Sequence, residues 1–245
     1  MKYVKLVFLG VGGWISKPLL GHTSILVEES SWKLLLDAGD GVYKSLFLYG
    51  GWLSGLRGIV VTHMHGDHVL GLPTIVMHLK HSGVRGVKVY APREALGDLD
   101  LLLRIVGVDY SGVIDILGVS DGDACTLEPF TLKFTRANHT TPALSVRVES
   151  SGKCFAYSGD TSYSPRLVEL SRGCEVLVHE ASGYDPTAHV HGHSTVEDAV
   201  RVALESGVEK LVLVHYYMDQ PHLERLEAPK GLKVYLAYPG MELEV

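Results

Sequence analysis

The sequence has little of several features that often assign a class of protein by themselves. It contains three cysteines among 245 residues, and no apolar run approaches the roughly 18 to 20 residues that a membrane-spanning helix needs. The cysteines, Cys125, Cys154 and Cys174, are odd in number and widely spaced. We therefore expect reduced, mostly buried thiols in a cytosolic protein and no disulfide framework.

Excess positive charge and a signal peptide are also absent. The formal net charge is −6, which argues against a surface that coats nucleic acid broadly. It does not argue against a local binding site, because bound divalent cations would make one site positive. Met1 to Lys5 lead straight into a β-prone run without the layout of a signal peptide. We therefore expect a cytoplasmic protein that does not enter a membrane.

A substantial core is expected, because 46 % of the residues are hydrophobic. The length suits one domain over residues 1–245, and no repeat, low-complexity segment or flexible linker divides it. A capping box at Ser194 to Glu197 predicts a helix that ends at Ser206. The other predicted helices are 40–49, 69–80, 92–106 and 166–171. Predicted strands are 5–9, 24–28, 33–37, several between 124 and 155, 176–178 and 211–214, so the class is α/β.

The sequence does have a dense cluster of residues that bind metals. His63, His65, Asp67 and His68 fall within six positions, directly after the apolar run Gly58 to Val61. Imidazole and carboxylate groups are the ligands that suit zinc and similar divalent metals. A protein core would not accept so many polar groups without metals or partners. The cluster therefore predicts a metal site where a strand ends.

Three further candidate ligands each follow a short β-prone run: His139, Asp160 and His215. In layered α/β proteins, functional sites gather at the carboxyl ends of strands. Positions far apart in the sequence are therefore expected to meet at one edge of the sheets. The alternative for Asp160 is that it caps the helix predicted at 166–171.

The spacing of these seven residues divides them between two metals. His63 and His65 are two positions apart, so in an extended chain their side chains point the same way and can bind one ion together. Asp67 and His68 are adjacent at the turn into a helix, so they aim at a neighbouring ion. A carboxylate has two oxygens and can bridge two metals, which is the role we assign to Asp160. The predicted sets are His63, His65 and His139 for one metal, and Asp67, His68 and His215 for the other.

Four stretches carry a resemblance to a known family. They are Leu9 to Gly13, Thr62 to His68 with its continuation Gly71 to Pro73, Val178 to Ala181, and His193 to Thr195. Over nearly its whole length the sequence resembles the metallo-β-lactamase superfamily, and within it ribonuclease Z, the transfer-RNA 3′-processing endonuclease, and its phosphodiesterase relatives. The resemblance implies a four-layer αββα sandwich and a homodimer. It also implies two divalent metal ions, zinc or else manganese or iron.

The resemblance further implies a hydrolytic mechanism. Two adjacent metals activate a water and neutralise a phosphoryl oxygen, so we expect a metal-bound hydroxide to attack a phosphodiester. Asp67 is expected to bind metal and to help take the proton of the water. His193 is the candidate acid for the leaving group, and Glu180 is expected to orient it and raise its pKa. The plainer alternatives are a loop carboxylate saturated by backbone donors for Glu180 and a packing role for His193.

The remaining histidines and the glycine run are expected to have no catalytic role. His179 is expected to pack under the site, and His189 and His191 to be exposed on a loop. Gly10 to Gly13 suggests a dinucleotide-binding loop, but no helix pattern follows it and Pro18 comes soon after. We therefore expect a tight loop beside the site. Three further histidines are expected to be structural or on the surface: His22, His78 and His81.

The sequence departs from the family pattern in two places. His139 and Asp160 are only 21 residues apart, which leaves room for one hairpin but not for the long transfer-RNA-binding arm of the bacterial enzymes. After His215, the segment Tyr216 to Gln220 replaces a Ser-x-Arg-Tyr pattern, so an arginine that could hold phosphate is missing. The candidates to replace it are Arg136, Arg147, Lys80 and Arg85.

These departures leave the substrate open between RNA 3′ ends and small nucleotide-like phosphodiesters. Two other functions are alternatives. A thioester hydrolase of the glyoxalase II kind, or a lactonase, would share the metal cluster but lack the elements around Glu180 and His193. A non-catalytic RNA-binding protein would keep the seven metal-ligand residues as a relic.

Overall fold

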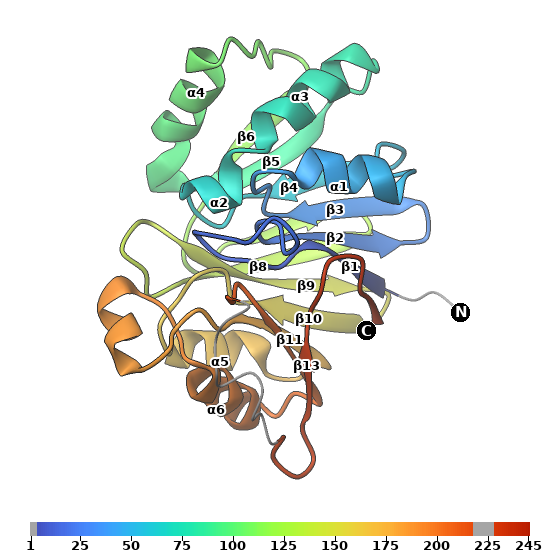
Figure 1. Ribbon diagram of the computed structural model, residues 1–245. Helices are drawn as coiled ribbons and strands as arrows, with labels where there is room; N and C mark the ends of the chain where they lie inside the picture. Colours follow the sequence, from blue (N-terminus) through green and yellow to red (C-terminus); the bar gives the residue numbers. More distant parts are fainter. Residues whose placement is uncertain (1–3, 218–227) are drawn as a thin grey trace.

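Two β-sheets packed face to face form the centre of the molecule. The computed structural model describes residues 4–217 and 228–245, and within these residues each sheet has seven strands. Helices cover the outer face of each sheet, so Figure 1 shows four layers in the order helices, sheet, sheet, helices. The αββα sandwich implied by the resemblance is thus confirmed. Within the same residues, no helix combines the length and the apolar character that crossing a bilayer requires.

The first sheet contains the amino-terminal strands and the last strand of the chain. Its order is β14-β1-β2-β3-β4-β5-β6, antiparallel from β14 to β3 and parallel from β3 to β6. The outer face of this sheet packs against α1, α3 and α4. The bounds are β1 Val4–Gly10, β2 Ser24–Glu29, β3 Trp32–Leu36, β4 Leu56–Val60, β5 Val87–Pro92, β6 Ile114–Val119, β14 Glu242–Glu244, α1 Val42–Tyr49, α2 Gly66–Val69, α3 Leu72–His81, η1 Arg93–Ala95 and α4 Leu96–Ile105.

The second sheet contains the strands that follow. Its order is β13-β12-β11-β10-β9-β8-β7, antiparallel from β7 to β10 and parallel from β10 to β13. Helices α5 and α6 cover its outer face. The bounds are β7 Ala124–Leu127, β8 Phe130–Arg136, β9 Leu144–Ser150, β10 Lys153–Tyr157, β11 Val176–Glu180, β12 Lys210–Val214, β13 Lys233–Leu236, α5 Pro165–Ser171, η2 Pro186–His191 and α6 Val196–Ser206.

Strands that are buried on both faces hold the layers together. In β10, Phe155 and Tyr157 point between the two sheets, whereas Cys154 and Ala156 point towards α5 and α6. Successive side chains of a strand face opposite sides, so an apolar run of this kind is buried only if both faces are covered. The continuous hydrophobic runs of the sequence therefore become the central strands of the sandwich.

The sequence analysis does not anticipate four strands. Three of them, β6, β13 and β14, lie at sheet edges, where several side chains are exposed and the hydrophobic pattern is weak. The fourth, β5, is an inner strand but ends in Pro92, which the sequence analysis assigned to a helix. The helix expected at 92–106 instead begins as the short η1 turn and continues as α4.

The predicted helix at 69–80 is two helices. α2 already begins at Gly66, and α3 begins at Leu72 after a break at Leu70 and Gly71. Gly71 donates its N–H to Ala38 O at 2.8 Å, and a Cβ there would come within 2.3 Å of Gly39 O. The break therefore comes from close packing against the loop after β3, which local sequence patterns do not reveal.

The capping box of α6 is present but shifted by one residue. Thr195, not Ser194, is the N-cap, and its hydroxyl accepts from the N–H of Asp198 while Asp198 accepts from the N–H of Thr195. Ser194 instead donates its hydroxyl to Thr161 O at 2.7 Å. The predicted end of the helix at Ser206, before Gly207, is confirmed.

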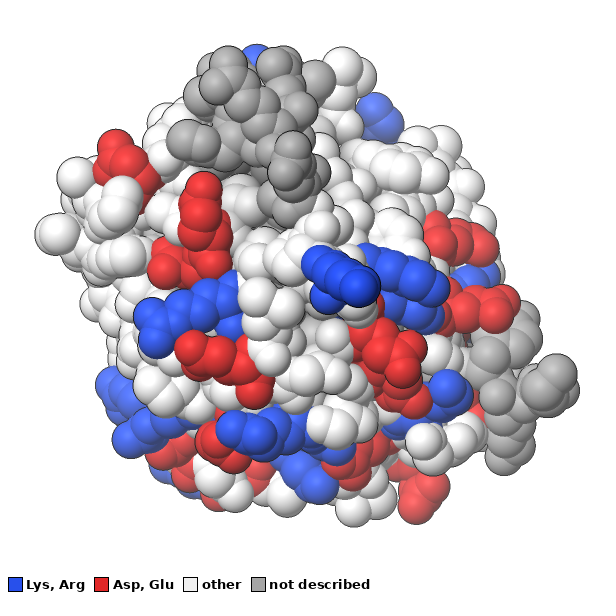
Figure 2. All heavy atoms as spheres, turned by 90° about the horizontal axis from the view of Figure 1, so that it is seen from below, with Lys and Arg blue, Asp and Glu red and all other residues white. Residues whose placement is uncertain are grey.

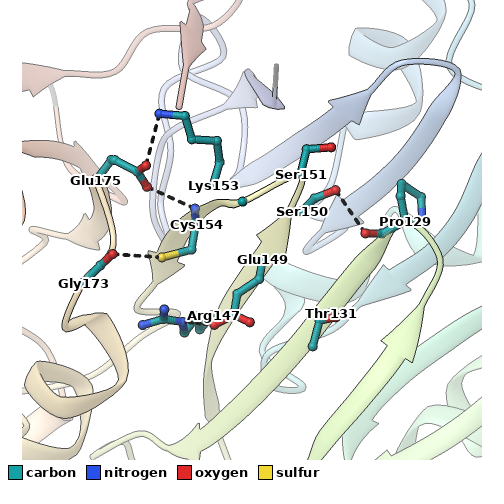
Figure 3. Close-up of a pocket in the computed structure, with 11 residues that line it drawn as sticks. Pro129, Thr131, Arg147, Glu149, Ser150, Ser151, Lys153, Cys154, Gly173 and Glu175 are labelled. Carbon is teal, nitrogen blue, oxygen red and sulfur yellow. Dashed lines mark hydrogen bonds and ion pairs between the residues drawn. The ribbon is translucent and has the colours of Figure 1, made fainter. Parts of the chain in front are cut away.

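The expectation of free thiols is wrong for two of the three cysteines. Cys154 and Cys174 form a disulfide with Cα atoms 4.9 Å apart, and Cys125 is free. The pairing follows from the parallel register of β10 and β11, which brings the start of one strand next to the turn before the other. Cys154 lines a pocket of about 430 Å³ at this end of the sheet. Figure 3 shows it there with Arg147, Glu149, Lys153 and Glu175.

Removal of this disulfide should destabilise the fold. Its cysteines are 20 residues apart, and a cross-link over such a loop contributes about 3 kcal/mol by constraining the unfolded chain. We expect the double variant Cys154→Ser/Cys174→Ser to lose about that much free energy of unfolding in a denaturant titration, and Cys125→Ser to lose much less. A double variant as stable as the oxidised protein would contradict the pairing.

Candidate metal centre

The candidate ligands meet at one edge of the sandwich because the strands before them run in the same direction. Within the first sheet this edge is the carboxyl end of β4, and within the second it is the carboxyl ends of β8, β10 and β12. The two sheets are joined here, since Leu144 N donates to Thr62 O at 3.1 Å. The residues that follow these strand ends are the His63–His68 cluster, His139, Asp160 and His215.

The imidazoles of the first predicted set converge on one point. His65 Nδ1 lies 3.1 Å from His63 Nε2 and 3.0 Å from His139 Nε2. Asp160 Oδ2 approaches the same point, 3.5 Å from His63 Nε2 and 4.0 Å from His139 Nε2. Ligand atoms of a tetrahedral zinc site lie about 3.3 Å apart, given Zn–N distances of about 2.0–2.1 Å. The spacing of these four residues therefore suits a single cation.

The second predicted set converges on a neighbouring point. Asp67 Oδ2 lies 3.0 Å from His215 Nε2 and 3.4 Å from His68 Nε2. Asp160 again takes part, with Oδ1 3.3 Å from His68 Nε2 and Oδ2 3.3 Å from His215 Nε2. Asp160 thus belongs to both groups, in each of which the ligand atoms lie within 4.8 Å of one another. It does not cap α5, whose N-cap is Ser164.

The charges of the cluster call for cations. Asp67 Oδ1 and Asp160 Oδ1 are buried and accept no hydrogen bond from the described residues. Burial lowers the pKa of His63, which favours the neutral imidazole that binds metals. Burial also lowers the pKa of His68, but the carboxylates of Asp160 and Asp37 outweigh it and raise the pKa well above its usual value. A proton on His68 therefore balances part of the carboxylate charge. A divalent metal would balance more of this charge.

Further hydrogen bonds orient the imidazoles. His139 donates Nδ1 to Gly192 O at 2.9 Å, which leaves Nε2 facing the cluster. His68 donates Nδ1 to Asp37 Oδ2 at 2.8 Å. Partners of this kind fix the ring and the tautomer of a metal-binding histidine. Both imidazoles are thus held with one nitrogen towards the centre.

Asp37 is a site residue that the sequence analysis missed. It is fully buried at the end of β3, where it accepts from Thr62 N at 2.7 Å, Thr62 Oγ1 at 2.9 Å, His68 Nδ1 and the hydroxyl of Tyr157 at 2.7 Å. The signal was available, because Asp37 ends the strand predicted at 33–37 just as Asp160 follows a later strand. Three of these bonds hold Asp37 to the segment after β4, and the fourth, from Tyr157 of β10, connects it to the second sheet.

His193 and Glu180 form a pair next to the cluster. His193 Nδ1 lies 2.8 Å from Glu180 Oε1, and His193 Nδ1 lies 3.9 Å from Asp160 Oδ2. Burial lowers the pKa of His193, but the charge and the hydrogen bond of Glu180 outweigh it and raise the pKa to about 9. This shift favours the protonated imidazolium, and 22 % of the His193 side chain is exposed beside the candidate metal ligands.

Glu180 pairs with His193 and is also saturated by other donors, which is the alternative role considered from the sequence. Its side chain also accepts from Thr161 N at 3.1 Å, Ser182 N at 3.1 Å and Ser182 Oγ at 2.8 Å. Glu180 is fully buried at the end of β11. Donors on several sides fix this buried carboxylate in place. It is therefore suited to orient His193.

The loop after β1 lies against the cluster, as expected for a tight loop beside the site. At Gly13, a Cβ would come within 2.8 Å of the His215 ring, so only glycine allows this approach. The next residue, Trp14, stands edge-on to His65 with ring centroids 5.5 Å apart. A second aromatic pair borders the site, since Tyr184 stacks on Tyr217 with centroids 6.1 Å apart. Burial and the carboxylates of Asp67, Asp160 and Glu180 raise the pKa of Tyr217 to about 12.

The other histidines have the burial that the sequence analysis expected, but His189 and His191 lie in the 3-10 helix η2 and not on a loop. His179 is fully buried with Nδ1 donating to Glu180 O at 2.8 Å, and His189 and His191 are exposed. His189 is nonetheless ion-paired, with Nε2 2.6 Å from Asp198 Oδ2. Two of the remaining three are half-buried and one is exposed: His22, His78 and His81.

The basic residues proposed to hold phosphate have other partners. Arg136 and Lys80 each form an ion pair with a carboxylate, and Arg147 and Arg85 donate to backbone carbonyl oxygens. None of the contacts described for these four residues involves a candidate metal ligand. Met218 to Gln220, the rest of the segment that lacks the family arginine, lie outside the described residues.

The hairpin between His139 and Asp160 is short, as predicted. β9 and β10 are joined by Ser151 and Gly152, which have φ of 53° and 78°. A two-residue turn with both φ positive is the tightest common hairpin connection. No long arm protrudes from this part of the chain.

Comparison with known proteins agrees with this fold and site. The profile of the beta-lactamase superfamily domain matches residues 33–216. The metallo-beta-lactamase fold protein YhfI from Bacillus subtilis superposes with a TM-score of 0.89 at 21 % identity, covering 99 % of this chain and 100 % of that chain. Human tRNase Z, short form, superposes with a TM-score of 0.83 at 22 % identity, covering 98 % of both chains. These structures define the class as the metallo-β-lactamase fold.

A relative with higher sequence identity identifies the family within this class of fold. A ribonuclease Z from Pyrobaculum arsenaticum is 35 % identical over 255 residues, which cover 88 % of this chain and 87 % of that protein. The chain therefore belongs to the ribonuclease Z family of the beta-lactamase superfamily. It is accordingly a metal-dependent hydrolase, and the resemblance stated from its motifs is confirmed.

Replacement of Asp37 should weaken metal binding. An asparagine has one acceptor oxygen instead of two, so it cannot satisfy Thr62, His68 and Tyr157 together. We expect Asp37→Asn to lower metal affinity about 10- to 100-fold in a chelator competition titration, as loss of a ligand's orienting partner does elsewhere. Asp40→Asn, at an exposed carboxylate three residues further on, is the matched control. Unchanged affinity in Asp37→Asn would contradict the orienting role.

Proposed function

We propose that this chain is a phosphodiesterase of the ribonuclease Z type that cleaves RNA 3′ ends or small nucleotide-like phosphodiesters with two zinc ions. The observation that carries the proposal is the sharing of Asp160 by two adjacent ligand groups beside the His193–Glu180 pair. The ribonuclease Z relatives favour this function over thioester or lactone hydrolysis and over RNA binding without catalysis.

The seven predicted residues would hold the metals in the arrangement already described. His63, His65 and His139 would bind one ion, Asp67, His68 and His215 the other, and Asp160 both. Two such ions supply positive charge to a phosphoryl oxygen and lower the pKa of a water between them. The oxygen Oδ1 of Asp67, which accepts no hydrogen bond from the described residues, would take the proton of this water.

His193 would act as the acid that protonates the leaving oxygen. Its Nδ1 is engaged by Glu180, so Nε2 is the nitrogen that remains to donate. The ring stacks on His215 with centroids 5.5 Å apart, and this contact holds it over the second ligand group. Glu180 stabilises the charged imidazolium and fixes the direction of its proton. An alkoxide leaving group needs such a proton, because it is a strong base.

The short hairpin bears on the choice of substrate. The long arm that would clamp a folded transfer RNA is absent between His139 and Asp160, so this hairpin does not supply such a clamp. We propose that the chain acts in the cytoplasm, as one domain over residues 1–245, and as a homodimer, as the resemblance implies. The metal identity is proposed as zinc because the first group is rich in imidazole.

A turnover panel tests the proposed reaction. The purified protein, with its metal content measured, is assayed on a precursor transfer RNA, a 2′,3′-cyclic nucleotide, a nitrophenyl phosphodiester and a thioester. We expect hydrolysis of at least one phosphodiester, loss of activity after chelation and recovery with zinc or manganese. Hydrolysis of the thioester alone would overturn the proposal.

The acid role of His193 has its own test. We expect His193→Ala to keep the full metal content and to lose about 10²- to 10⁴-fold in phosphodiesterase turnover, because only the proton donor is removed. His191→Ala, at an exposed position two residues away, should retain both properties. Joint loss of metal and activity in His193→Ala, or no loss of activity, would show that the assignment is wrong.

A further inference from the structure

Trp14 is an exposed aromatic side chain at the candidate metal centre. Its ring stands nearly perpendicular to the ring of His65, at 87°, with centroids 5.5 Å apart. Gly13 before it lies against the His215 ring, so the turn touches one member of each ligand group. The loop thereby places an indole beside the point at which the reacting phosphate would lie.

Most of this indole faces solvent. Trp14 is 59 % exposed, and Ile15 beside it is 76 % exposed, whereas Trp52 is buried in the core and Trp32 is 36 % exposed, with the guanidinium of Arg57 over its ring at 3.8 Å. Trp14, Ile15 and Leu19 are thus three exposed apolar side chains in one loop, and exposed apolar surface beside a functional site is a place where a ligand can bind. In a perpendicular contact His65 can cover at most one face of the indole, so at least one ring face is not covered by the imidazole.

The arginines near the site are engaged by carboxylates, so a ligand there would be held by stacking on its bases rather than by these charges. The arginines near the end of β8 are already paired: Arg136 with Glu94, Arg166 with Asp121 and Arg93 with Asp123. Away from the site, on the lower face of the molecule, Figure 2 shows Lys and Arg interspersed with Asp and Glu. Lys17, exposed in the same loop as Trp14, adds one positive charge. A protein with few unpaired cations can still bind a nucleic acid by stacking, which needs no charge.

We propose that Trp14 is a stacking platform for the nucleobase of a nucleotide that flanks the scissile phosphodiester. The inference rests on the proposed function and deepens it, because it restricts the substrate to diesters that carry a base beside the cleaved bond. An unpaired, single-stranded end fits such a platform, since its bases are free to stack on an aromatic ring. A base-free diester would reach the same metal centre without this contact.

The simplest competing role for Trp14 is to position His65. That role would act on the metal site itself, so its loss would lower metal affinity and would affect every substrate equally. Stacking acts only on ligands that have a base at the right position. The two roles therefore separate in an experiment that removes the base and the indole in turn.

The test removes the indole and the base, separately and together, and measures RNA binding and turnover in each case. The metal-loaded protein, the variants Trp14→Ala and Trp14→Phe, and the control Trp32→Ala at the far end of β3 are compared. Each is titrated with a short single-stranded RNA that has an uncleavable phosphonate at the scissile position. The same RNA is then used with an abasic ribose at either flanking nucleotide, and the cleavable versions give kcat/KM.

We expect one abasic position to weaken binding to the wild-type protein and to Trp32→Ala about 5- to 150-fold, the range for loss of one base–aromatic stack. In Trp14→Ala the intact RNA should bind with that same loss, the abasic penalty should disappear and the metal content should stay full. Trp14→Phe should retain part of the penalty. Equal binding of intact and abasic RNA by the wild-type protein would overturn the inference, as would an undiminished abasic penalty or reduced metal content in Trp14→Ala.

These outcomes are separate from the proposed function. If the protein cleaves base-containing and abasic RNA equally well, the phosphodiesterase proposal stands and the stacking inference falls. If it binds RNA with the expected penalty but cleaves no phosphodiester, Trp14 still stacks on a base, whereas the proposed function falls and the restriction on the substrate falls with it.

Discussion

The structure depends on the burial of carboxylates and imidazoles together in the seam between two sheets. Asp37, Asp67 and Asp160 are at most 4 % exposed, and His63, His68 and His215 at most 1 %. Ionised groups out of water cost several kcal/mol each unless they are paired. Hydrogen bonds satisfy Asp37, but Asp67 and Asp160 keep unbonded oxygens, so the cluster is complete only with cations. The ligand arrangement and the chemistry both follow from this unbalanced charge.

Two residues of the site adopt an unfavourable backbone conformation. Asp37 and His215 both have positive φ, at 57° and 56°, a region that residues other than glycine rarely adopt. Each residue directly follows a buried strand, and the left-handed turn redirects its side chain into the seam. The surrounding hydrogen bonds and apolar layers stabilise these conformations, as is common at functional sites. The rigid strand ends thus supply the positioning that catalysis by metals requires.

The sequence predicts those parts of the molecule in which local pattern and chemistry coincide. No knowledge of strand register was needed to predict the ligand cluster after β4, the further ligands after strand ends, or the αββα fold that the resemblance implies. Features set by tertiary contact were missed: the break at Gly71, the edge strands, and the Cys154–Cys174 pair that the β10–β11 register creates. Asp37 was missed because its partners, His68 and Tyr157, lie on other segments. The shifted cap of α6 shows that hydrogen bonds of the loop decide between adjacent candidates.

The central claim is a two-metal centre bridged by Asp160, and anomalous diffraction from crystals of the zinc-reconstituted protein tests it most directly. The account predicts two anomalous peaks per chain, roughly 3.5–4 Å apart. One peak should be ligated by His63, His65 and His139, the other by Asp67, His68 and His215, with Asp160 touching both. A single peak, or peaks away from these side chains, would contradict it.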